Sequence, residues 1–499
     1  MATLARGGRT NTLGFVIRAL GGIPFLFIGY RLYGVEEMGR FAAAFVIIEI
    51  FALICALGEK RGLAQRLTEG AEKEGVAQSN LVFDGMLTSL LFSLTACLIL
   101  LAFPVIIFPS GTNSDLDMWM IAAIPAFALT EILLAAQAYR YDIATTVRAR
   151  AIVEPWTKSF AVGALFFVPV LSEGGLALAF LASIYAALLT AFWSFIRTYG
   201  LPKGWRPRPR YLGKMTARAL PLIGADVIER GTRLLDVFLL GQSASAGAVG
   251  IYFFAKEIAS LPQKLKSSFE PILSPVITKN LKIGNMDAIA SQVRQVGFWI
   301  VALQLGVALA LAIPGEAIMG LGGPAIVGGT GALALMLAAE VVASMAVVSE
   351  SVLVYIARKR NLLMSVGVIT LQGVLTIGFI MAADRLQLDD GFKAGGAALA
   401  LFLALGASSL VKSLVLRRLL KAPISNWRWA LVWATGPAVV IGFAFTLLPE
   451  WVELLFGVPA ILMTYFAVVW HRGFGPEDKV LFRGKVVPAE PAPDPVKPT

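Results

Sequence analysis

Residues 225–236, ADVIERGTRLLD, place charged side chains in a stretch that otherwise has the composition of a membrane span. The preceding residues 219–224 (ALPLIG) and the following residues 237–241 (VFLLG) are apolar. At 100° per residue, the charged residues fall within an arc of about 120° on one face of a helix. Each charge facing lipid at the bilayer centre would cost about 2.5–3.5 kcal/mol on insertion scales. The sequence therefore predicts a membrane helix whose charged face looks into protein or water. The residues are Asp226, Glu229, Arg230, Arg233 and Asp236.

The composition of the whole chain is that of a polytopic membrane protein. Its 499 residues are 57% hydrophobic and 15% charged, whereas soluble domains carry about 25% charged residues. Repeated apolar runs of about twenty residues predict an all-α fold with about fourteen transmembrane helices. The predicted spans are 13–33, 40–58, 81–108, 118–139, 156–171, 176–197, 216–241, 249–277, 292–313, 331–357, 362–383, 396–416, 429–448 and 453–470.

The loops between these spans alternate sharply in charge. One side carries 33 lysine and arginine residues, and the other carries only four. By the positive-inside rule, the basic side and both termini are cytoplasmic. The net charge of +11 is thus accounted for by membrane topology, and nucleic-acid binding is not needed to explain it.

The chain divides at its longest internal polar connector. Residues 200–215 are rich in proline and arginine and are predicted to form a cytoplasmic linker. We expect a six-helix lobe before it (1–199) and a second six-helix lobe after it (216–420). Two additional transmembrane helices (421–472) and a proline-rich, disordered cytoplasmic tail (473–499) complete the chain.

An internal repeat accompanies this division. Residues 30–41 (YRLYGVEEMGRF) match residues 236–252 (DVFLLGQSASAGAVGIY), with a glycine, a polar turn and a Gly-x-aromatic in each. Gly34 corresponds to Gly241, and Gly39 corresponds to Gly250. A parallel repeat of this kind predicts a substrate site at the interface between the two lobes.

The same segments resemble a known family. GVEEMGRF (34–41) followed by FALICALG (51–58), and LLDVFLLG (234–241), AVGIYFFAKEIAS (248–260) and PILSPVITK (271–279), are similar to the polysaccharide-biosynthesis flippases. These belong to the multidrug/oligosaccharidyl-lipid/polysaccharide exporter superfamily. The resemblance covers nearly the whole chain in topology.

The resemblance implies a transporter in the bacterial inner membrane. Its substrate would be an undecaprenyl-pyrophosphate-linked oligosaccharide, flipped by alternating access for the synthesis of O-antigen, capsule or exopolysaccharide. The implied partners are this lipid-linked substrate, membrane lipids, other polysaccharide-assembly proteins, and H⁺ or Na⁺ as a coupling ion. No cofactor is implied, and no cysteine–histidine spacing indicates a metal.

The charged residues of the spans are the candidates for a substrate cavity. A pyrophosphate needs arginine or lysine donors, and sugar hydroxyls pair with carboxylates and guanidinium groups. The span 249–277 adds two lysines to the charged face of the preceding span, and Arg18 and Glu49 join them if the lobes face each other. The candidate cavity residues are Arg18, Asp226, Glu229, Arg230, Arg233, Asp236, Lys256 and Lys264.

A structural interpretation of the same charges stays open. Asp226 with Arg230, and Glu229 with Arg233, are spaced i,i+4 and can neutralise each other on one helix. Four acids in other spans are candidates for ion coupling or for satisfied polar contacts. They are Glu49, Asp84, Glu131 and Glu340.

Two other functions compete with flipping. A multidrug or cation antiporter of the same superfamily commonly places an acid in the first span, where this chain has Arg18. A membrane-embedded glycan polymerase needs a carboxylate cluster beside a sizeable loop, and the extracytoplasmic loops here are short. The sequence thus favours a transporter that is not an enzyme.

Overall fold

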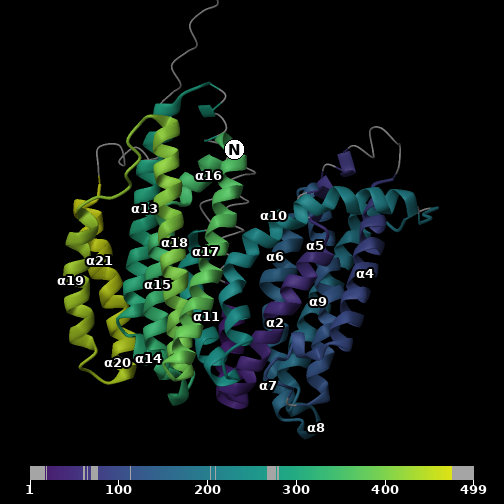
Figure 1. Ribbon diagram of the computed structural model, residues 1–499, viewed down its shortest axis with the longest axis horizontal. Helices are drawn as coiled ribbons and strands as arrows, with labels where there is room; N and C mark the ends of the chain where they lie inside the picture. Colours follow the sequence, from purple (N-terminus) through teal and green to yellow (C-terminus); the bar gives the residue numbers. More distant parts are fainter. Residues whose placement is uncertain are drawn as a thin grey trace, which may run out of the picture.

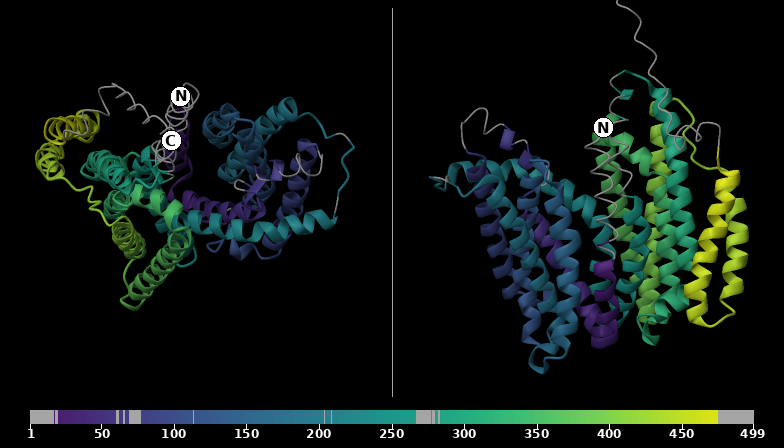
Figure 2. Two further views of the ribbon diagram at one scale, coloured as in Figure 1. Left: turned by 90° about the horizontal axis from the view of Figure 1, so that it is seen from above. Right: turned by 180° about the vertical axis from the view of Figure 1, so that it is seen from behind.

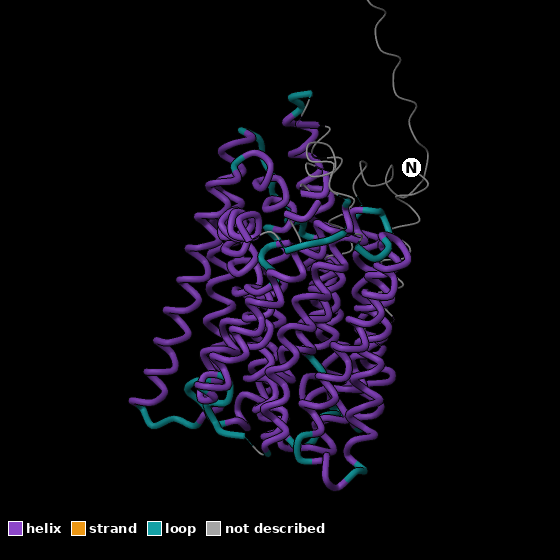
Figure 3. The backbone as a smooth tube through the Cα atoms, turned by 90° about the vertical axis from the view of Figure 1, so that its right-hand side faces the viewer, coloured by secondary structure: helices purple, strands orange, loops and turns teal. Residues whose placement is uncertain are grey.

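The computed structural model describes residues 17, 20–59, 62–64, 66–68, 77–112, 114–202, 204–207, 209–266, 277, 280–281 and 283–474. Within these ranges the chain is helical apart from its connecting turns, and it has no β-strand (Figure 3). The predicted all-α fold is confirmed.

The N-terminal lobe is built from helices that start and stop at clear local signals. Gly34, with φ of 87°, ends the first helix and begins the second, a backbone geometry that only glycine adopts readily. Glu36 and Glu37 in the next turn favour the helix N-terminus electrostatically. Gly200, with φ of 74°, closes the last helix of the lobe. The elements are a first helix at 20–28 that continues as η1 (Gly29–Tyr33), α2 (Val35–Cys55), α4 (Gln78–Ala102), η2 (Pro104–Ile106), η3 (Asp115–Ala122), α5 (Ala123–Tyr139), α6 (Ile143–Val147), η4 (Arg148–Val153), α7 (Glu154–Phe166), α8 (Pro169–Ser172) and α9 (Gly175–Tyr199).

The C-terminal part of the chain contains a second lobe and two further helices. Its elements are α10 (Pro209–Gly241), α11 (Ala246–Lys266), α13 (Met286–Ala312), α14 (Gly315–Gly320), η5 (Pro324–Gly329), α15 (Thr330–Ser344), α16 (Val347–Ile356), α17 (Arg358–Arg385), α18 (Asp390–Leu420), α19 (Ala430–Phe445), α20 (Glu450–Val452), η6 (Glu453–Gly457) and α21 (Val458–Arg472).

The predicted spans correspond to these helices one by one. Nine helical segments among the described residues are long and apolar enough to cross a membrane. The remaining predicted spans are the first helix, the continuous run from α6 to α7, the shorter α19, and the charged α10 and α11. The fold class of about fourteen membrane helices, in two six-helix lobes with two added helices, is confirmed.

Some boundaries differ from those predicted from the sequence. Helix α10 begins at Pro209, inside the segment predicted as a linker, so residues 209–215 are already helical. The fifth span starts at Ile143 rather than at 156, because the polar residues that precede α7 are already helical. Apolar length alone could not show either extension, since both consist of polar turns added to the ends of apolar helices.

The two lobes stand side by side (Figure 1). The helices from α2 to α9 form one group and those from α11 to α18 the other. The first part of α10 crosses over the N-terminal group, and its later part turns down between the lobes beside α11 (Figure 2). Helices α19 and α21 lie at the outer edge, where Leu431 and Tyr465 pack with Phe298 of α13.

Candidate functional site

Helix α2 joins the lobes because it packs against both α10 and α11. Near the N-terminal end of α2, its backbone almost touches the backbone of α11. A Cβ on Gly39 would lie 1.7 Å from the carbonyl oxygen of Ala246, and one on Gly250 would lie 2.2 Å from the carbonyl oxygen of Val35. Only glycine allows helices to approach so closely. We call this contact the glycine crossing; it brings together Gly39 and Gly250, the residues that the internal repeat matches.

Further contacts between the lobes surround the glycine crossing. The hydroxyl of Tyr30 donates a hydrogen bond to the carbonyl oxygen of Gly250, and its ring packs edge-on against Phe254 at 5.0 Å between centroids. Arg31 donates from Nε and Nη2 to the carbonyl oxygens of Leu321 and Gly320, at 3.0 and 3.1 Å. These contacts close the lobes together at this end of the molecule.

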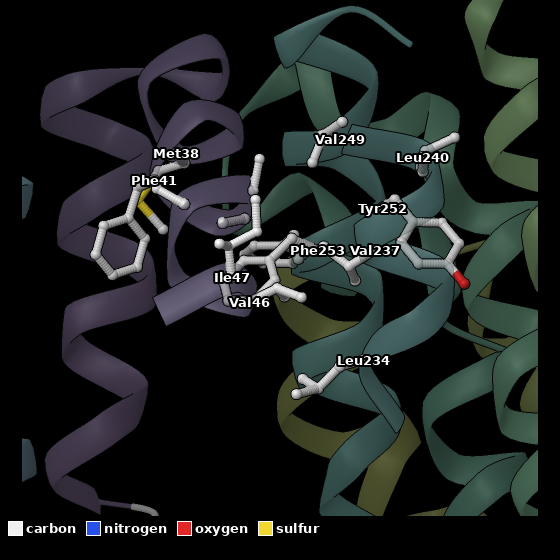
Figure 4. Packing of buried hydrophobic residues seen from close by; sticks show 14 of the residues in the cluster. Met38, Phe41, Val46, Ile47, Leu234, Val237, Leu240, Val249, Tyr252 and Phe253 are labelled. Atoms are coloured by element: carbon white, nitrogen blue, oxygen red, sulfur yellow. The ribbon is translucent and has the colours of Figure 1, made fainter. Parts of the chain in front are cut away.

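Apolar side chains continue the interface along α2. Figure 4 shows Val46 and Ile47 of α2 beside Val237 of α10 and Phe253 of α11, all members of one buried cluster. Phe45 also packs against Phe253, with 6.5 Å between ring centroids. This packing separates the glycine crossing from the charged face of α10.

The charged face meets α2 at Glu49. Arg230 donates to Glu49 Oε1 from Nε at 2.7 Å and also from Nη2, so the two charges form an ion pair between the lobes. The side chain of Glu49 is only 5% exposed, whereas that of Arg230 is 54% exposed. Glu49, predicted as a candidate coupling acid, is therefore the buried partner of an arginine whose side chain remains half-exposed.

Arg233 is held within the second lobe. It forms an ion pair with Glu340 of α15 through Nη1. Its Nη2 and Nε each lie 3.1 Å from the amide oxygen of Gln263 on α11, in the amide orientation that satisfies both groups. The carboxylate that the structure pairs with Arg233 is thus Glu340, on another helix of the same lobe. The side chain of Glu229 lies outside the described residues.

Asp236 is the centre of a buried polar cluster. Its Oδ1 accepts hydrogen bonds from Lys256 Nζ and from the backbone N–H of Val237 at 2.9 Å, and its Oδ2 accepts one from the Tyr252 hydroxyl at 2.7 Å. The carboxylate is fully buried and both oxygens have donors. Asp236 and Lys256 therefore neutralise each other between α10 and α11. Asp226 is also buried, one turn before Arg230.

The remaining candidate coupling acids also have partners in the protein. Glu131 pairs with Arg150, which also contacts Glu154 at 2.7 Å. Asp84 accepts a hydrogen bond from the indole N–H of Trp205 at 2.9 Å, which fastens the connector between the lobes to α4. Among the described residues, no group of three or more His, Cys, Asp or Glu side chains could hold a metal ion.

The structure brings together only part of the predicted cavity. Arg18 and the side chain of Lys264 lie outside the described residues. Tyr252, Gln263 and Trp205 were not predicted from the sequence. Tyr252 precedes Lys256 by four residues on the same helix, and this spacing is the one local signal that could have pointed to it.

The fold and its charged interface define a multi-pass membrane protein built on the two-lobed plan of known flippases and exporters. The structure is similar to "Lipid II flippase MurJ, inward closed conformation" (TM-score 0.71, 13% identity, 95% of this chain and 98% of that one). It is also similar to an inward-facing multidrug resistance MATE family transporter (0.61, 16%, 83% and 94%) and to a MOP superfamily transporter from Pyrococcus furiosus (0.54, 14%, 84% and 96%).

A narrower assignment follows from the sequence itself. Residues 4–281 match the family model described as "Polysaccharide biosynthesis protein". This range covers more than half of the chain, and the chain belongs to that family. No curated protein matches the sequence. The family resemblance seen in the turn sequences of both lobes is therefore confirmed.

Proposed function

We propose that this protein flips an undecaprenyl-pyrophosphate-linked oligosaccharide across the bacterial inner membrane by alternating access. Membership in the polysaccharide biosynthesis family and the MurJ-like fold support this proposal. The observation that carries it is the half-exposed side chain of Arg230 on the interface between the lobes. A planar guanidinium suits a pyrophosphate because it donates several hydrogen bonds in a fixed geometry.

The arrangement of the interface suits a large amphiphilic substrate. The head group would meet the charged face of α10, with its mixture of carboxylates and guanidinium groups, while the prenyl tail stays in lipid. The glycine crossing holds the far end of the lobes together, so the head group would have access from one side at a time. Flipping then requires the crossing to open. No covalent chemistry is needed, and we propose that the protein is not an enzyme.

The orientation in the membrane follows from the loop charges. With 33 basic residues on one side and four on the other, we propose that both termini and the 200–208 connector are cytoplasmic. The glycine crossing then lies toward the periplasm. The substrate would be made on the cytoplasmic side and released on the periplasmic side, where other polysaccharide-assembly proteins would receive it.

The pairing of the interior acids speaks against the antiporter alternative. A cationic drug needs a carboxylate that is free to bind it, whereas Glu49, Glu340 and Asp236 are each held by an arginine or lysine of the protein. Coupling to H⁺ or Na⁺ at Glu49 or Glu340 would likewise require the carboxylate to exchange its arginine. The likeness to MATE transporters concerns the fold alone.

Depletion of the protein tests the proposal. We expect an oligosaccharide linked to undecaprenyl pyrophosphate to accumulate in the cytoplasmic leaflet, detected by mass spectrometry of extracted lipids. Susceptibility to cationic drugs should not change. If drug susceptibility rises and the lipid-linked sugars stay constant, the antiporter alternative is correct. If polymer length changes while the single repeat unit still reaches the periplasm, the polymerase alternative is correct.

A further inference from the structure

We propose that Glu49 occupies the anion-binding position of Arg230 in the resting protein, and that the diphosphate of the substrate displaces it. The Arg230–Glu49 pair would then be an exchangeable latch between the lobes. This inference rests on the proposed function and deepens it, since it assigns one residue to the phosphate and another to the release of the interface.

The first support is the unequal exposure of the two partners. Glu49 is buried in α2, while more than half of the Arg230 side chain is accessible. The side chain of Arg230 is therefore open to an incoming anion to a greater extent than that of its partner. Arg233 lies deeper, at 24% exposure, and has both Glu340 and Gln263 as partners. Lys256 is 19% exposed and is paired with the fully buried Asp236. Arg230 is the most accessible of the three cations.

The second support is the place of the pair in the fold. The Arg233–Glu340 and Lys256–Asp236 pairs each join helices of one lobe. The Arg230–Glu49 pair joins α10 of one lobe to α2 of the other. Of the three pairs formed by Arg230, Arg233 and Lys256 it is the one that bridges the lobes, so its exchange changes how the lobes are held together.

The third support is the chemistry of the exchange. A diphosphate carries more negative charge and more acceptor oxygens than a single carboxylate, so it competes well for a guanidinium. Once displaced, Glu49 would be a buried carboxylate without its cation, which is strongly unfavourable. The interface relieves this by letting α2 move away from α10 and admitting water to Glu49. Binding of the head group is thereby linked to loosening of the α2–α10 contact.

If the diphosphate displaces Glu49, then removing the charge of Glu49 should strengthen substrate binding rather than weaken it. Glu49→Gln removes the competing charge while keeping the shape of the side chain, so it should strengthen binding of undecaprenyl pyrophosphate to the protein in nanodiscs. We expect an apparent Kd about three- to tenfold lower, because the competent form of Arg230 is no longer occupied by Glu49. Arg230→Gln should weaken binding about tenfold or more. Export by Glu49→Gln should be slower at saturating substrate, since nothing displaces the bound head group.

Glu340→Gln is the matched control, because it neutralises another interior glutamate that pairs with an arginine, but within one lobe. It should tighten binding less than Glu49→Gln, because Arg233 lies deeper and keeps Gln263 as a partner. Inorganic pyrophosphate in place of the lipid separates a site for the free anion from one for the lipid head group; we expect it to compete only weakly. Thermal unfolding of each variant in the same nanodiscs shows whether the fold is retained.

Two results would overturn the latch. One is weaker binding by Glu49→Gln, matching that of Arg230→Gln, which would make the pair purely structural. The other is equal tightening by Glu340→Gln, which would make the effect a general one of charge. Failure of the proposed function looks different, because then the wild-type protein would not bind or flip the lipid at all. Glu49→Asp, which retains the charge, should bind like the wild type and excludes a steric explanation.

Discussion

Helix α2 holds the two lobes together at two places, with opposite chemistry. At the glycine crossing, Gly39 and Gly250 bring two backbones into direct contact, and no charged side chain takes part in that approach. Further along the same helix, Glu49 reaches the half-exposed Arg230 by an ion pair. The positions 39 and 49 are about 15 Å apart along the helix at 1.5 Å per residue. One helix therefore carries a contact set by shape and another set by charge.

The two contacts between the lobes differ in how each can be broken. Close packing depends on shape, so the glycine crossing is either formed or separated, with few intermediate arrangements. An ion pair can exchange one partner for another without a change in shape. The crossing is thus suited to closing one end of a pathway, and the Arg230–Glu49 pair to sensing an anion. Three predictions test the crossing and the charged face, and a fourth tests the connector between the lobes; they run from the largest expected effect to the smallest.

The strongest prediction is that locking the crossing end stops export completely. A Cβ on Gly241 would lie 3.1 Å from the Cβ of Ala43, close to the separation of about 3.8 Å in a disulfide. We expect Ala43→Cys with Gly241→Cys, in a background lacking Cys55 and Cys97, to export glycan when reduced and not when oxidised. Mass spectrometry of surface glycan with and without reductant measures this. Each single cysteine variant is the control, and export by the oxidised pair would mean that this end does not open.

The next prediction tests the close approach itself. Gly39→Ala adds a Cβ that would meet a backbone carbonyl oxygen at 1.7 Å, so the helices must move apart. Overpacking of this kind costs about 1–3 kcal/mol. We expect a lower thermal midpoint and a loss of most export. Gly378→Ala in α17 is the matched control, because nothing lies within 4 Å of its added Cβ. Equal behaviour of the two variants would show that the crossing tolerates separation.

The third prediction concerns the charged face and breaks the ion pair between Arg233 and Glu340. Arg233→Ala leaves Glu340, only 7% exposed, without its cation, which costs about 3–5 kcal/mol. We expect low membrane abundance and no export. Adding Glu340→Ala should restore abundance, because the unpaired charge is gone, but not export, if the guanidinium also contacts substrate. Quantified immunoblots measure the abundance of each variant, and glycan assays on the same cells measure its export. Restored export in the double variant would make the pair structural.

These two contacts also show what the sequence could predict. The helices and the charged face of 225–236 follow from local hydropathy and a 100° repeat, so they were predictable. Gly39 and Gly250 were matched by the repeat, although their contact was not foreseen. Glu49 was expected near the charged face, but the particular pairs of Arg230 and Arg233 were not predictable, because Glu49 and Glu340 lie 181 and 107 residues away. The i,i+4 rule compares residues of one helix only, whereas these two ion pairs form between helices.

The smallest effect is expected away from both contacts, at the connector between the lobes. Trp205→Phe keeps a ring that can pack on Phe83, now 5.8 Å away between centroids, but removes the donor to Asp84. The loss of one such hydrogen bond costs about 1 kcal/mol. We expect a small drop in thermal midpoint and export near that of the wild type, with Trp119→Phe at an exposed position as the control. The hydrogen bond from Trp205 to Asp84 fixes where the connector lies and does not hold the lobes to each other, so its loss should be tolerated. If Trp205→Phe abolished export as the disulfide lock does, the connector would have to be counted with the glycine crossing and the Arg230–Glu49 pair as a third contact that controls the lobes.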